Sequence, residues 1–149
     1  MKKRKPGELG DTHKRGINIT LALLDEMLCQ IEQWARGREV HSVLYQERNT
    51  LTGVQREMIL HEIKAIRRTL CELAQTLRLE PNVNDGSREI WGRCWGFLEH
   101  LEELQGRHLE RYGEPPAWLK GYLDPRAGEL IEHLTKIASV AGGADMKTD

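Results

Sequence analysis

The sequence predicts an all-α protein, an up-down antiparallel four-helix bundle with one or two extra short helices. Two observations carry this prediction. Four long segments have apolar residues three and four positions apart, which places those residues on one side of an α-helix. Connections rich in glycine, proline, asparagine and aspartate separate the segments, and no segment shows the strict alternation of a β-strand.

Length and composition favour one domain. The chain has 149 residues, of which 39% are hydrophobic, enough for one core if the apolar residues lie on helix stripes. We expect this domain to span residues 16–141. Residues 1–15 are basic and lack apolar periodicity, so they are predicted to form a disordered tail, and residues 142–149 are predicted to be a frayed C-terminal tail.

The first helix is predicted at about residues 18–36, and Gly37 is placed to end it. Its apolar stripe consists of Ile17, Leu21, Leu24, Leu28, Ile31 and Ala35, with Met27 and Trp34 beside it. Residues 39–48 carry few apolar side chains: Val40, Val43 and Leu44. We interpret them as a short amphipathic helix, with a loop as the alternative.

The segment 52–79 has the clearest helical periodicity in the chain, and Thr52 with Gln55 matches a capping box. Its stripe is narrow and consists of Ile59, Ile63, Ile66, Leu70, Leu73 and Leu77. A helix this long must pair with other helices or with another copy of itself. Arg56, Arg67 and Arg78 run beside the stripe, and we expect them to pair with glutamates of a neighbouring helix. The alternative is a basic stripe for an anionic partner.

The third helix is predicted to follow a loop at residues 80–87, capped by Asp85 or Ser87. It is predicted to run to about Arg111, with Gly113 placed to end it. Its apolar residues cover about half of the circumference, so we expect it at the centre of the core.

The remaining segment is predicted to hold one short and one long helix. Pro116 suits the first turn of a short helix that carries Trp118 and Tyr122, which we expect to seal one end of the bundle. Asp124 followed by Pro125 is typical of an N-cap and a first turn, and predicts the start of a last helix that runs to Ala141.

A candidate interface lies on the third helix. Gly92, Gly96 and Gly106 share one line, and each glycine costs roughly 1 kcal/mol relative to alanine inside a helix. Close approach of another helix would explain the repetition; tolerated, exposed glycines are the alternative. Trp91 and Trp95 flank the line and supply anchoring area. We therefore predict an interface at Trp91, Gly92, Trp95 and Gly96.

Metal and cofactor sites are not expected. No histidine has a glutamate three residues before it, the spacing of di-iron carboxylate bundles. Glu57 with His61 and Glu129 with His133 are interpreted as solvated pairs one turn apart. The cysteines have no metal-ligand spacing and are expected to be reduced, with Cys94 in the core. The glutamates of the third and last helices are interpreted as a solvated face, with a Mg²⁺ site as the alternative.

His108 is the one histidine placed on an apolar face, that of the third helix. We interpret it as a hydrogen-bonded core residue. The alternative is a ligand-binding or proton-transferring role in a pocket near Trp118 and Tyr122.

An arginine followed within a few residues by a histidine resembles the active-site signature of HEPN-type RNases, which are helical bundles that work as dimers. Arg126 and His133 match this pattern on the last predicted helix. The same loose pattern recurs at Arg56 with His61 and at Arg93 with His100. The resemblance implies a histidine that acts as general base toward a ribose hydroxyl and an arginine that stabilises the phosphorane.

These observations favour a non-enzymatic interaction protein, a scaffold or adaptor that acts as a homo-oligomer. The alternative is a HEPN-like RNase or another nucleic-acid-associated helical bundle. The basic tail is interpreted as a solvated terminus; the alternative is an arm that binds nucleic acid or an acidic partner through Lys2, Lys3, Arg4 and Lys5. No apolar run approaches the ~18 residues that cross a bilayer and no signal-peptide pattern is present, so we expect no membrane partner and a cytoplasmic location.

Overall fold

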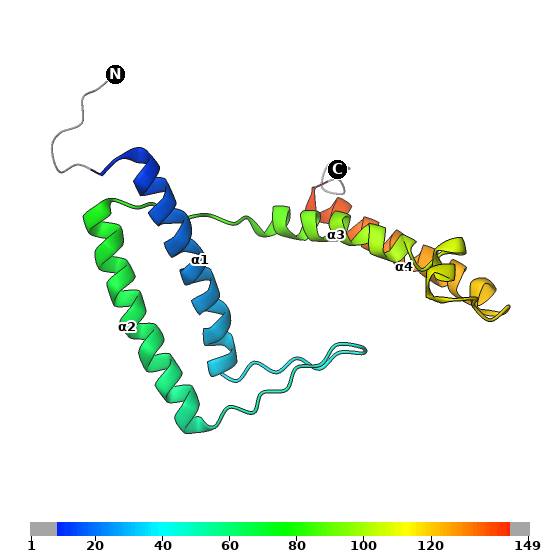
Figure 1. The fold of residues 1–149 in the computed structure, drawn as a ribbon, viewed down its shortest axis with the longest axis horizontal. Coiled ribbons are helices and arrows are strands. Elements are labelled where there is room, and N and C mark those ends of the chain that lie inside the picture. The colour runs from blue at the N-terminus through cyan, green and yellow to red at the C-terminus, as the bar shows by residue number, and fades with distance from the viewer. Residues whose placement is uncertain (1–8, 144–149) are drawn as a thin grey trace, which may run out of the picture. The chain divides into compact units, whose positions relative to one another are not determined.

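The computed structural model describes residues 9–143 and shows an all-α fold (Figure 1). Its helices are α1 (Asp11–Ala35), α2 (Gly53–Leu77), α3 (Gly86–Glu102), the short 3₁₀ helix η1 (Gly106–Tyr112) and α4 (Leu119–Ala141). No strand is present within this range. The predicted all-α class is confirmed, η1 is a short extra helix, and helix contacts of α1 with α2 and of α3 with α4 support bundle packing.

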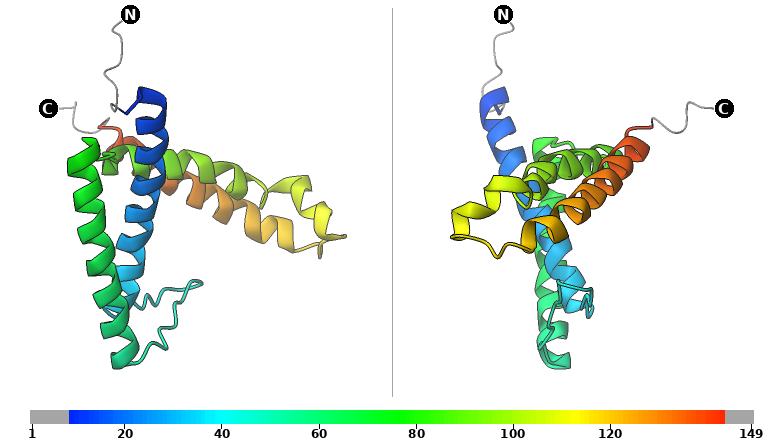
Figure 2. Two further views of the ribbon diagram at one scale, coloured as in Figure 1. Left: turned by 60° about the vertical axis from the view of Figure 1, so that its left-hand side comes forward. Right: turned by 90° about the vertical axis from the view of Figure 1, so that its right-hand side faces the viewer.

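The chain divides into two compact units, Met1–Asn82 and Val83–Asp149, and each is described by itself. In each unit two long helices run antiparallel, side by side (Figure 2). The single domain predicted over residues 16–141 stays a prediction. Residues 1–8 of the predicted N-terminal tail, with Lys2, Lys3, Arg4 and Lys5, lie outside the described residues, and so do residues 144–149 of the C-terminal tail.

The start of α2 confirms the capping box. The Thr52 hydroxyl accepts a hydrogen bond from the Gln55 backbone N–H at 3.1 Å, and the Gln55 side chain accepts one from the Thr52 N–H at 2.9 Å. Ile63 of the predicted stripe is buried and its other members are half-buried. The stripe therefore packs within the first unit, against α1.

Helix α1 begins at Asp11, well before the predicted start near Asn18, so Asp11–Arg15 of the predicted tail is helical. The carboxylate of Asp11 in the first turn favours this start because it complements the helix dipole. Gly37 follows the end of α1 with φ +100°, as predicted for a terminating glycine. A Cβ at Gly37 would lie 3.0 Å from Nη1 of Arg56, whose flexible side chain can shift, so the positive φ is the feature that favours glycine here.

Residues 39–48 are not helical, which corrects that prediction. They form a hairpin-like excursion with a single β-bridge between His41 and Gln46, and the Glu47 N–H donates to the Val40 carbonyl at 2.7 Å. In Figure 1 this connection projects away from α1 and α2. The three apolar residues gave a false helical signal, since two of them, Val43 and Leu44, are almost fully exposed and form no packed helix face.

Helix α3 is capped by Asp85, whose side chain accepts from the Ser87 N–H at 3.3 Å, but it ends at Glu102 rather than near Arg111. The chain becomes extended at Gln105 and left-handed at Gly106 (φ +58°). The Gly106 N–H donates to the Asp124 carboxylate at 3.0 Å, so a partner distant in sequence sets this break.

Helix α4 begins at Leu119, which corrects the predicted start at Asp124. Asp124 and Pro125 lie inside the helix, and the Asp124 side chain caps the start of η1 instead. The predicted short helix with Trp118 and Tyr122 has become the N-cap and first turn of α4. Both aromatic side chains are exposed and do not seal the second unit.

Small residues let α3 and α4 approach closely, since Ala127 and Ala138 of α4 are fully buried. Replacing Ala138 by leucine should overpack this contact and lower the free energy of unfolding by about 1–3 kcal/mol. Urea denaturation of the full chain measures this change. Ile137→Leu on the exposed side of α4 is the control and should change stability by less than about 0.5 kcal/mol; equal effects of the two substitutions would refute the close packing.

Candidate functional site

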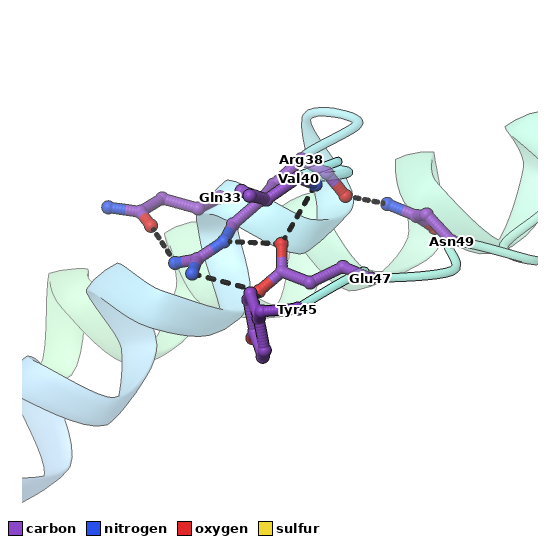
Figure 3. A network of polar contacts seen from close by, with 6 residues as sticks. All are labelled: Gln33, Arg38, Val40, Tyr45, Glu47 and Asn49. Atoms are coloured by element: carbon purple, nitrogen blue, oxygen red, sulfur yellow. Dashed lines mark hydrogen bonds and ion pairs between the residues drawn. The ribbon is translucent and has the colours of Figure 1, made fainter. Parts of the chain in front are cut away.

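The connection between α1 and α2, residues 36–52, holds the densest polar network in the described part of the chain. Its centre is the carboxylate of Glu47, a residue only 6% exposed. Nε and Nη2 of Arg38 each donate to this carboxylate at 2.9 Å, the Val40 N–H donates at 3.1 Å and the Tyr45 hydroxyl at 2.6 Å (Figure 3). A buried carboxylate with four donors is fully satisfied, so it fixes the loop geometry.

The network also anchors the loop to the end of α1. Nη1 of Arg38 donates to the Gln33 side chain at 2.8 Å, and the guanidinium lies 5.6 Å from the centre of the Trp34 ring. Nδ2 of Asn49 donates to the carbonyls of Trp34 and Arg38 at 2.8 and 2.9 Å. The Trp34 carbonyl also accepts from the Gly37 N–H at 3.0 Å, so Asn49 adds a second bond at the end of α1 and ties the loop to it.

The charges of the loop are compensated internally. Hydrogen bonds from Arg38 and then Tyr45 lower the pKa of the Glu47 carboxyl, and the same contacts raise the pKa of Arg38 and of the Tyr45 hydroxyl. The backbone N–H of Asn49, followed by the His41 ring at 2.8 Å, lowers the pKa of Glu39. The tip of the loop thus carries no uncompensated carboxylate.

This network supports an apolar tip that points into solvent. Val43 and Leu44 are 91% and 99% exposed, and they lie between the paired residues His41 and Gln46. Long connections without regular secondary structure are uncommon in compact domains and are often functional. The arrangement suits a preformed contact that inserts two aliphatic side chains into a partner.

A second candidate surface is an exposed apolar row on α1. Ile19, Leu23 and Met27 follow one another at intervals of four residues and are each about half or more exposed. Val54 and Met58 have the same spacing and exposure at the start of α2. Rows spaced by four residues lie along one side of a helix, so these are continuous surfaces rather than scattered side chains.

The predicted interface residues of α3 lie at the surface. Trp91 and Trp95 are about half exposed with ring centres 6.1 Å apart, and a Cβ at Gly142 would lie 3.3 Å from Cδ1 of Trp91. A Cβ at Gly92 or Gly96 would meet no atom within 4 Å. Gly106 does not continue their line because α3 ends before it, which corrects the predicted three-glycine stripe.

An open depression of about 760 Å³ lies in the second unit, between η1, the end of α3 and α4. It is lined by Glu102, Gln105, Gly106, His108, Lys120, Asp124, Gly128 and Ile131. His108 is exposed here rather than in the core, because the continuous third helix that would have buried it does not form. Trp118 and Tyr122 are not among the lining residues.

Arg126 and His133 are not brought together. They are seven residues apart on α4, which places them roughly 10 Å apart along the same side of the helix. The Arg126 guanidinium lies 3.8 Å from the centre of the Tyr122 ring and donates to the Tyr122 carbonyl at 2.8 Å. His133 lies 3.9 Å from the Glu129 carboxylate, as expected for a solvated pair.

The remaining residues considered in the sequence analysis are the arginines of α2, the candidate metal ligands and the cysteines. Arg67 makes the expected ion pair across the hairpin, with Glu32 of α1, and this contact lowers the pKa of Glu32. Within residues 9–143, no ion pair is found for Arg56 or Arg78, and no three His, Cys, Asp or Glu side chains are grouped as a metal site would require. The cysteines are free; Cys94 is buried as predicted, whereas Cys29 and Cys71 are exposed.

Two features were missed at the level of sequence. The row of Ile19, Leu23 and Met27 had a detectable signal, a second helical spacing beside the first stripe. The pair of Arg38 and Glu47 had none, because polar residues nine positions apart form no periodic pattern.

No protein-family model, curated protein or solved structure matches the chain. Among residues 9–143, no helix combines the length and the apolar character needed to cross a bilayer.

Glu47→Gln should release the loop, because glutamine cannot satisfy Arg38 and Tyr45 as the carboxylate does. We expect hydrogen exchange of the residue 47 amide to accelerate by about tenfold or more, with unchanged helix content by circular dichroism. Glu57→Gln, at an exposed position of α2, is the matched control. Unchanged amide protection in the Glu47 variant would refute the anchoring role.

The loop should also open in acid. Glu47 and Glu39 have lowered pKa values in the fold, so their stabilising contribution is complete above the ordinary glutamate pKa of about 4.3 and is lost as pH falls through the lowered values. The raised pKa of Tyr45 makes its contribution complete below about 10 and lost as pH rises through the raised value. Amide chemical shifts of Val43 and Leu44 report both transitions. An acid midpoint at or above about 4.3 would contradict the predicted direction.

Proposed function

We propose that the protein is a non-enzymatic interaction module that assembles with further copies of itself and serves as a scaffold or adaptor. The supporting observation is that each unit leaves many apolar side chains uncovered. Among the described residues of the first unit, the buried apolar side chains are Leu28, Ala35 and Ile63. Helices of this length gain most of their stability from packing. A core this small therefore favours contacts with further helices.

The uncovered side chains are concentrated on long helices, where a partner helix can meet them as a row. In the first unit they are Ile19, Leu23, Met27, Val54 and Met58. In the second unit they are Ile90, Trp91, Trp95, Phe97, Leu130, Ile137 and Val140. Tryptophan, phenylalanine and methionine are the residue types enriched at protein interfaces. Burying each of these half-exposed side chains contributes about 1 kcal/mol, so several together support stable association.

The loop tip supports the adaptor part of the proposal. Val43 and Leu44 are held in water by the Glu47 network, so their burial by a partner would supply a hydrophobic gain that folding of the chain does not use. A tip of two aliphatic residues suits an apolar pocket on a different protein. We propose a cytoplasmic location, which the surface thiols of Cys29 and Cys71 support because exposed free cysteines persist in reducing compartments.

Self-association is tested by native mass spectrometry and light scattering of the purified full chain. We expect an oligomer at about 10 μM that dissociates on dilution with a defined constant. A chain that is monomeric up to about 500 μM would refute the homo-oligomer.

A further inference from the structure

We infer that the α1–α2 hairpin docks face to face on the hairpin of a second copy, through the surface that carries Ile19, Leu23, Met27, Val54 and Met58. This surface is named the Leu23 face. The inference rests on the proposed self-association and specifies which surface and which partner carry it. The partner is a second copy related by a two-fold axis, so that the same face is used on both sides.

Helix geometry places the two halves of the Leu23 face on one side of the hairpin. The ion pair between Glu32 of α1 and Arg67 of α2 marks the other side. Leu23 precedes Glu32 by nine positions and Met58 precedes Arg67 by nine positions. Nine residues correspond to about two and a half turns, so Leu23 and Met58 each point away from the ion pair.

The α1 part of this face is free of charge along its whole length. Successive positions on an arc of roughly 100° are Thr12, Gly16, Ile19, Thr20, Leu23, Met27, Gln30 and Trp34. The charged residues of α1 lie on the remaining arc and are Asp11, Lys14, Arg15, Asp25, Glu26 and Glu32. The stripe that packs on α2 occupies the arc between these two. Helix α1 is therefore uncharged over roughly 200° of its circumference, whereas a helix with a single neighbour needs roughly 100°.

The α2 part of the face permits close approach. Beyond Met58, the positions on the same line are Ala65, Thr69 and Thr76, which are small and uncharged. Glu62 and Glu72 lie roughly 40° to either side of this line, at the edges of the face, so the line itself contains no carboxylate. These small residues form a shallow groove along α2. The larger side chains of Leu23 and Met27 from a second copy can pack into it.

Charge and area select a second copy over other occupants. The face carries no basic side chain, so it offers nothing to a phosphate backbone or to an acidic peptide. Two hairpins that meet through such faces form four helices around an apolar centre, a stable arrangement for helices of this length. The 25 residues of α1 span roughly 38 Å and two adjacent helices are roughly 20 Å wide, so the face offers roughly 750 Å², close to the ~800 Å² per partner of stable interfaces.

Charge insertion on the face tests the inference. Leu23→Glu should raise the dimer dissociation constant by at least about 100-fold, because a two-fold interface buries the introduced carboxylate twice. Asn18→Glu adds the same charge to the same helix on its charged arc and should leave the constant within about threefold of the original. Sedimentation equilibrium of the full chain measures both constants, and circular dichroism confirms equal helix content.

The neutral variant Leu23→Gln keeps the test decisive if the glutamate variant loses helix content; it should raise the constant by about tenfold or more. A folded Leu23 variant that dimerises as tightly as the original refutes the Leu23 face but leaves the proposed self-association standing. A monomeric original chain refutes both. If Asn18→Glu raises the dissociation constant as much as Leu23→Glu does, the effect is a general one of charge. That result also refutes docking through the Leu23 face.

Discussion

Two packed helices can bury only the side chains that lie between them, and this constraint governs the structure. In the first unit α2 covers one stripe of α1, and a second uncharged arc that includes Leu23 and Met27 stays in water. In the second unit the buried alanines of α4 bring α3 close, yet Phe97, Leu130 and Ile137 remain about half exposed. Each hairpin is thus organised around a seam and leaves an apolar face available, which connects the packing to the proposed association.

The connection between α1 and α2 obeys a different constraint, the requirement that a buried carboxylate be fully paired. Glu47 meets it with Arg38, Tyr45 and the Val40 N–H, all within the same loop. Because these partners are local, the loop holds its form without apolar burial at its tip. The result is a rigid, neutral support for Val43 and Leu44, the kind of preorganised contact that loses little entropy on binding.

Features set by local interactions could be predicted from the sequence. The Thr52 and Gln55 capping box, the Asp85 cap and the terminating Gly37 depend on neighbouring residues, and the structure confirms them. The predictions that were wrong concern residues whose hydrogen-bond partners are distant in sequence. Asp124 carries a strong N-cap signal, but its carboxylate binds the Gly106 N–H, which ends the third helix early and frees α4 to begin at Leu119. Residues 39–48 were predicted as a helix from three apolar residues, whereas the contact that shapes them, between Arg38 and Glu47, leaves no periodic pattern in the sequence. The exposed row of α1 could have been predicted from the sequence, since Ile19, Leu23 and Met27 repeat every four residues.

The most direct test of the central claim is an isotope-filtered NMR experiment on mixed copies, one labelled on the methyl groups of isoleucine, leucine and methionine and the other on nitrogen. Only contacts between copies give cross-peaks in such a mixture. We predict intermolecular contacts from the methyl groups of Leu23 and Met27 to amides of α1 and α2. Contacts confined to other methyl groups, or an absence of intermolecular contacts at millimolar concentration, would contradict it.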